Sequence, residues 1–139
     1  MSILEKFFKN KKEVSEPEEK EEQSLEVKAE TNITHAIEIS SDGKLYKTET
    51  AELIIQGHFS FVNSNFSDAK AYFVTPKGNF FSATAYAERH ERVKDGVIVH
   101  ELNIIYGNIK PEPPEAIKMA IGKTNIELYK KYFGEVEEA

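Results

Sequence analysis

The chain of 139 residues contains no cysteine and no tryptophan. The absence of cysteine excludes a disulfide framework and any zinc site built from thiolates. It also fits a reducing compartment, so we expect a cytoplasmic protein whose core is held together by apolar burial alone.

Long apolar runs are absent as well, and negative charge exceeds positive charge. No stretch approaches the roughly 20 apolar residues that span a bilayer, and the first residues are too charged for a secretory signal. The 18 Lys and Arg residues stand against 24 Asp and Glu residues, which gives a net charge of −6. Since attraction to phosphate groups dominates non-specific nucleic-acid binding, this charge argues against nucleic acid as a partner.

Large apolar residues are few in the first 30 residues, where the composition separates two segments from a domain. Residues 1–12 combine lysines with apolar residues at helical spacing, namely Ile3, Leu4, Phe7 and Phe8. This short basic amphipathic segment is predicted to dock into a partner's groove or lie on an anionic membrane surface, and a frayed terminus without function is the alternative. Residues 13–30 carry eight acids against two lysines, which predicts a disordered acidic linker. Residues 31–139 then form a single domain.

Two turn sequences set the register of three strands in the middle of the chain. The sequence from Thr75 to Gly78 suits a type I turn followed by a left-handed glycine, which pairs Phe73 with Phe81. Asp95-Gly96 suits a two-residue hairpin turn. Both turns assign one set of residues to a single face, which we predict to be the core: Ala69, Ala71, Phe73, Phe81, Ala83, Ala85, Ala87, Leu102 and Ile104.

Two earlier strands complete the predicted sheet. The first runs from about Ile33 to Ile39 and puts Ile33, Ile37 and Ile39 on one side. The second runs from about Leu45 to Val62, with a bulge or bend at Gly57.

The segment after Pro113-Pro114 is predicted to be helical and to cover the alanine-rich face. An unbroken helix would carry two nearly opposite apolar stripes, and its exposed stripe would favour self-association. Gly122 suits a helix end, and Thr124 with Glu127 matches a capping box, so we predict a break into two helices. The predicted fold is therefore α+β, a five-stranded antiparallel β-meander with C-terminal helical segments packed on one face.

The other face of the predicted sheet combines aromatic rings with hydroxyl, amide and ammonium groups. This mixture is typical of interfaces and pockets. The predicted ligand-binding or partner-binding residues are Lys70, Tyr72, Phe80, Thr84, Tyr86 and Asn103. The alternative is that a second core layer or a dimer buries them.

The hairpin around Asp95-Gly96 is a second candidate surface. Its charged residues are Arg89, His90, Glu91, Arg92, His100 and Glu101. The register sets Glu91 opposite His100, and His90 opposite Glu101 on the other face, so each histidine would lie beside a carboxylate. Such pairs suit a pH-sensitive contact or an acid and a base, whereas a solvated arm with cross-strand charge pairs is the alternative.

No nucleophile constellation, metal-ligand spacing or phosphate loop in the sequence is specific, so we expect no catalytic residue, no metal and no cofactor. We hypothesise a non-enzymatic binding or regulatory module that contacts a protein partner or a small ligand through the outer sheet face and the hairpin arm. The alternatives are single-stranded nucleic-acid binding by stacking on Tyr72, Phe80 and Tyr86, and a small enzyme that uses His90, His100 and Glu101. Homo-oligomerisation stays open.

Overall fold

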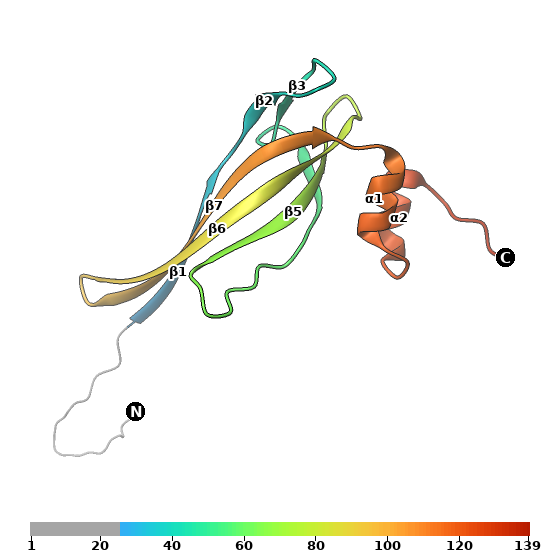
Figure 1. Ribbon diagram of the computed structural model, residues 1–139. Helices are drawn as coiled ribbons and strands as arrows, with labels where there is room; N and C mark the ends of the chain where they lie inside the picture. Colours follow the sequence, from blue (N-terminus) through green and yellow to red (C-terminus); the bar gives the residue numbers. More distant parts are fainter. Residues whose placement is uncertain (1–25) are drawn as a thin grey trace, which may run out of the picture. The chain divides into compact units, whose positions relative to one another are not determined.

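The computed structural model describes residues 26–139 (Figure 1), and our predictions for residues 1–25 lie outside this range. Within it the strands are β1 (Glu26–Thr34), β2 (Ile37–Ile39), β3 (Leu45–Lys47), β4 (Glu52–Gln56), β5 (Phe66–Val74), β6 (Phe80–Lys94) and β7 (Val97–Pro111), and the helices are α1 (Pro114–Ile121) and α2 (Ile126–Phe133). The α+β class is confirmed. Because β1 begins at Glu26, the last residues of the predicted linker are a strand.

The described residues form a five-stranded sheet in the order β1-β7-β6-β5-β4 and a separate two-stranded hairpin, β2-β3. The five strands are confirmed, but the antiparallel meander is wrong, because the sheet is mixed. Side-chain hydrogen bonds join Asn32 to Asn103, and Glu38 to the backbone N–H of Ile109. From Asn32 in β1 to Glu38 in β2, the contacts move from Asn103 to Ile109 in β7, so the chain leaving β1 runs in the same direction as β7. Two parallel strands need a long crossover, and the chain from β2 to β6 supplies it.

One compact unit contains residues 29–90 and 101–139. The tip of the β6-β7 hairpin, residues 91–100, belongs to a second unit together with residues 26–28. We describe the tip by itself, and Arg89, His90 and Glu101 of the predicted hairpin arm belong to the first unit.

The two predicted turns are confirmed. Gly78 has a φ of +88°, its N–H donates to the carbonyl of Thr75 at 2.8 Å, and the strand pairing sets Phe73 opposite Phe81. Asp95 and Gly96 both have positive φ, at 53° and 78°, between the end of β6 and the start of β7. Two-residue turns of this kind match the twist of the strands they join.

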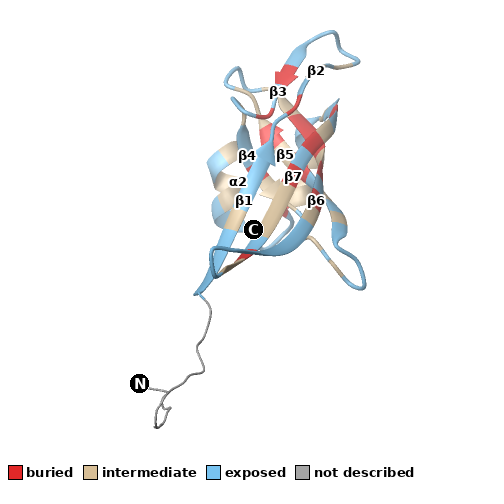
Figure 2. Cartoon of the chain, turned by 90° about the vertical axis from the view of Figure 1, so that its left-hand side faces the viewer, coloured by how far each residue is buried: buried red, intermediate tan, exposed pale blue. Residues whose placement is uncertain are grey.

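The alanine-rich face is buried as predicted, but the β2-β3 hairpin and the segment before β5 cover it, not the helices. Tyr46 of β3 packs against Phe81 with ring centroids 5.1 Å apart, and Phe73 stacks on Phe81 at 5.0 Å. Phe59 and Phe61 also pack on this cluster. Figure 2 shows the buried stretches in red on β3 and on the central strands.

The helices pack on the opposite face, which corrects the predicted placement. Ile117 and Ile121 are buried with Ile54, and Phe80 lies against Phe133 with ring centroids 5.7 Å apart. The physical reason is that Tyr72, Val74 and Phe80 give this face an apolar end, while aromatic rings already fill the alanine side. In Figure 1 the two helices lie together after the end of β7, apart from the β2-β3 hairpin.

The strands before β5 also differ from the prediction. Ile33, Ile37 and Ile39, which we predicted on one side of a single strand, are all exposed and belong to two strands, β1 and β2. The single strand predicted from Leu45 to Val62 is interrupted, because β3 ends at Lys47 and β4 spans only Glu52–Gln56. A register shift between Leu53 and Ile55 marks the bulge, rather than Gly57, and it turns Ile54 toward the helices.

The predicted break between the helices is confirmed. The N–H of Gly122 (φ +82°) donates to the carbonyl of Lys118 at 3.1 Å, which ends α1. The capping residue of α2 is Asn125 rather than Thr124, since the Asn125 Oδ1 accepts from the N–H of Leu128 at 3.2 Å. Asparagine is among the strongest N-cap residues.

We expect the substitution Asn125→Ala to lower the free energy of unfolding by about 1 kcal/mol, because it removes this cap. Thr124→Ala is the matched control and should change stability by less than about 0.5 kcal/mol. Urea denaturation followed by circular dichroism measures both. A larger loss for Thr124→Ala than for Asn125→Ala would assign the cap to Thr124 after all.

Candidate functional site

The helices divide the outer face of the sheet into a covered end and an open end. Tyr72 and Phe80, two of the predicted binding residues, pack against the helical cluster and are only partly exposed. The open end carries the other four together with Ile105. We call these five residues the outer-face patch: Lys70, Thr84, Tyr86, Asn103 and Ile105.

Two apolar side chains protrude from the patch. Tyr86 is 47% exposed and Ile105 is 53% exposed. The Cε2 atom of the Tyr86 ring lies 3.7 Å from where a Cβ at residue 107 would be, an ordinary contact distance, so the ring lies beside β7 at Gly107. Within residues 26–139 the Tyr86 hydroxyl has no hydrogen-bond partner, which leaves it available to a binding partner.

Polar contacts fix the edges of the patch. The Asn32 side-chain amide donates to Asn103 Oδ1 and to Glu101 Oε2, both at 2.9 Å. At the other edge, Lys70 Nζ lies 3.7 Å from Glu112 Oε2, which also accepts from the buried hydroxyl of Ser82 at 2.6 Å. These bonds hold Asn103 and Lys70 in place before any partner arrives.

A cluster at the edge strand β4 holds the second helix. Glu52 Oε2 accepts from Lys131 Nζ and from the Tyr132 hydroxyl, both at 2.7 Å. Hydrogen bonding to Lys131 and then to Tyr132 lowers the pKa of Glu52, and the bond to Glu52 raises the pKa of Lys131. Burial and, after it, the same carboxylate raise the pKa of Tyr132. All three groups therefore keep their usual charge near neutral pH, and α2 stays attached to β4.

In the hairpin arm, each histidine lies near a carboxylate. His100 Nε2 is 3.7 Å from Glu91 Oε2, as the turn register predicts. His90 Nε2 is 3.1 Å from Glu88 Oε2, two residues earlier on the same strand, a pairing that the register argument missed. Arg92 is exposed.

Arg89, also assigned to the arm, has a structural role. Its Nε donates to Asn65 Oδ1 at 3.3 Å and a terminal nitrogen donates to the carbonyl of Phe61 at 3.2 Å. The guanidinium also lies 4.8 Å from the centre of the Phe61 ring. Arg89 thus anchors the loop before β5 to β6, and it is less free to contact a partner than its sequence position suggests.

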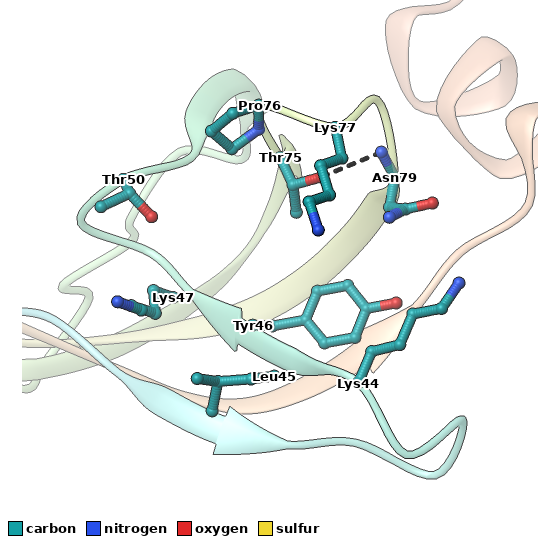
Figure 3. Close-up of a pocket in the computed structure, with 9 residues that line it drawn as sticks. All are labelled: Lys44, Leu45, Tyr46, Lys47, Thr50, Thr75, Pro76, Lys77 and Asn79. Atoms are coloured by element: carbon teal, nitrogen blue, oxygen red, sulfur yellow. Dashed lines mark hydrogen bonds between the residues drawn. The ribbon is translucent and has the colours of Figure 1, made fainter.

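A pocket of 580 Å³ between the β2-β3 hairpin and the β5-β6 turn was not predicted (Figure 3). It is lined by Lys44, Leu45, Tyr46, Lys47, Thr50, Thr75, Pro76, Lys77 and Asn79. Three lysines and no acid line it. The sequence gives no signal for it, because its two walls lie about 30 residues apart in a chain of unknown fold.

Within residues 26–139 no group of three or more His, Asp or Glu side chains is placed to hold a metal ion. In the same range no helix has the length and apolarity needed to cross a membrane. Comparisons of the chain with known protein families, with curated proteins and with solved structures found no match.

Proposed function

We propose that the chain is a non-enzymatic binding module that contacts a protein partner through the outer-face patch. The observation that carries this proposal is the pair Tyr86 and Ile105, two large apolar side chains half exposed on a sheet face whose other end the helices cover. Aromatic residues in the middle of such a surface, with amide and hydroxyl groups around them, are typical of protein interfaces.

A protein partner suits the patch better than a small ligand. Neither the lysine-lined pocket nor the cavity beside α1 and α2 includes a patch residue. Small ligands bind in concave sites that bury most of their surface, whereas protein partners use open faces. The tip of the β6-β7 hairpin supplies a second contact surface in this proposal, with Glu91, Arg92 and His100 as its charged groups.

The two alternative functions are less well supported by the same geometry. A stacking platform for single-stranded nucleic acid needs several exposed rings. Tyr72 and Phe80 pack under the helices, so of the three proposed stacking rings Tyr86 alone is exposed. The lysine at the patch, Lys70, already faces Glu112. An enzyme would need its acid and base groups to converge on one substrate. His90 instead lies beside Glu88, and His100 lies beside another carboxylate, that of Glu91.

The experiment starts with affinity capture from the native host by the full-length protein, followed by measurement of the dissociation constant for the captured partner. We expect Tyr86→Ala and Ile105→Asp each to weaken binding by about tenfold or more, because they remove the apolar centre of the contact. Met119→Ala is the matched control, since Met119 is 81% exposed on α1, outside the patch. It should leave the affinity unchanged.

A parallel capture uses a protein that lacks residues 1–25, a truncation that leaves β1 intact. Partners lost in this capture depend on the N-terminal segment, and partners retained bind elsewhere. An affinity that survives both patch substitutions would contradict the proposed surface. Turnover of nucleotides, esters or peptides by the purified protein, unaffected by Tyr86→Ala, would contradict the binding module as a whole.

A further inference from the structure

The lysine-lined pocket has one wall from β3 and one from the turn between β5 and β6. The turn is rigidly built, since the N–H of Asn79 donates to Thr75 Oγ1 at 3.0 Å and Thr75 N–H donates to the Asn79 carbonyl at 2.9 Å. The other wall is anchored by Tyr46, which is 2% exposed and packs on Phe81. Hydrogen bonds within the turn therefore fix one wall, and packing of Tyr46 on the core fixes the other.

The ammonium groups of the pocket are not neutralised by acids that line it. In the part of the chain that the structure describes, Lys44, Lys47 and Lys77 form no ion pair. Asp42, which does not line the pocket, interacts electrostatically with Lys44. Its carboxylate accepts from the Tyr46 hydroxyl at 2.5 Å and from the Lys44 N–H at 3.0 Å. Lys47 and Lys77 are thus the least compensated charges of the pocket.

The tyrosine in the pocket wall adds no negative charge. Burial, and then the hydrogen bond to Asp42, raise the pKa of Tyr46 to about 12, so its phenol stays neutral. The pocket is therefore a site of positive potential in a chain whose net charge is −6. A pocket lined by positive charge attracts small anions, even when the net charge of the protein is negative.

We infer that this pocket binds an anion that carries a phosphate group. A phosphate bears about 1.5 to 2 negative charges at neutral pH and three acceptor oxygens, and lysine binds phosphate as a point charge. In Figure 3 the Lys77 side chain extends from the turn toward Tyr46 and the Lys44 side chain points toward Asn79, whereas the Lys47 side chain points away from them. An anion between the turn and β3 would meet the ammonium groups of Lys77 and Lys44.

The phosphate can come from a soluble molecule or from a lipid headgroup, and the hairpin gives a reason to test both. Ile37, Ile39 and Leu45 are 64%, 75% and 55% exposed and share the outer side of β2-β3 with Lys47. Exposed aliphatic side chains beside lysines are typical of surfaces that lie in a membrane interface. Leu45 lines the pocket itself.

The test uses the full-length protein with pyrophosphate in titration calorimetry, and with vesicles of phosphatidylcholine alone or mixed with phosphatidic acid in co-sedimentation. We expect saturable binding in at least one arm, which identifies the source of the phosphate. Lys44→Gln and Lys77→Gln should each weaken it about tenfold or more, because each removes one hydrogen bond to a charged group. Lys110→Gln, an exposed lysine of β7 outside the pocket, is the matched control and should have no more than a small effect.

Absence of binding in both arms would overturn the inference. An equal loss of affinity for Lys110→Gln would overturn it as well, because the anion would then respond to the total positive charge of the protein and not to the pocket. Equally tight binding of succinate, a carboxylate without phosphate, would contradict the ligand class. None of these results bears on the outer-face patch, because the two sites share no residue.

Discussion

Replacing Phe81 with alanine is expected to lower the free energy of unfolding by about 4 kcal/mol. Phe81 is 0% exposed and lies between two other rings, Phe73 at 5.0 Å and Tyr46 at 5.1 Å. The substitution removes the transfer free energy of the ring and leaves a cavity that neighbours on two strands cannot fill without moving. Since a domain of this size is stable by about 5 to 15 kcal/mol, the loss is a large share of the total.

Urea denaturation at 25 °C measures the change, with Tyr86→Ala as the matched aromatic control. Tyr86 is half exposed on the same strand, β6, so its removal should cost less than about 1 kcal/mol. A loss below about 1.5 kcal/mol for Phe81→Ala would contradict the packing of the β2-β3 hairpin on the alanine-rich face, because a ring open to solvent costs little to remove.

The second large effect is expected at Ile117, where alanine should lower the free energy of unfolding by about 3 kcal/mol. Ile117 is 0% exposed although it lies in a helix of eight residues. A helix this short is not stable alone in water, so its side chain is buried because the helix packs on the sheet. Loss of the side chain weakens the attachment of α1 and the contacts of Ile54 and Ile121.

The matched control is Met119→Ala on the same helix, which should change stability by less than about 0.5 kcal/mol because Met119 is 81% exposed. Helix propensity changes little between these two substitutions, so the difference between them reports packing. Equal effects for Ile117→Ala and Met119→Ala would show that the helices are not part of the cooperative unit.

Local rules were sufficient to predict much of the sheet. The residues from Thr75 to Gly78 and the pair Asp95-Gly96 allow few backbone conformations, and each fixes which residues lie opposite one another. The period of two then carried the register along β5 and β6 as far as Ala69 and Ala85, as the structure has it. The break at Gly122 followed from the same kind of local signal.

The same rules could not decide which face the helices cover, because both faces carry residues that suit a core. Small residues such as Ala83 and Ala85 permit a close approach by a helix, but equally by the ring of Tyr46. The choice depends on where β3 and the loop before β5 pack, which involves contacts far apart in the sequence. The mixed sheet was missed for the same reason, since β1 and β7 lie about 70 residues apart.

The candidate sites were only partly accessible to sequence reasoning. Tyr86 and Asn103 could be proposed from the sequence because alternation assigns them to the outer side of the sheet. The lysine-lined pocket was missed because the turn containing Lys77 and the strand containing Lys47 meet only in the folded chain. A single lysine in a turn is usually a solvated surface residue, so neither position gave a signal of its own.

The helices pack on the outer face of the sheet and leave the patch at its other end open. Nuclear Overhauser effects between side chains test it most directly. The account predicts cross-peaks between the rings of Phe80 and Phe133, whose centroids lie 5.7 Å apart, and none between Ile117 and the methyl groups of Ala83 or Ala85. Cross-peaks from Ile117 to those alanines, without any from Phe133 to Phe80, would contradict it.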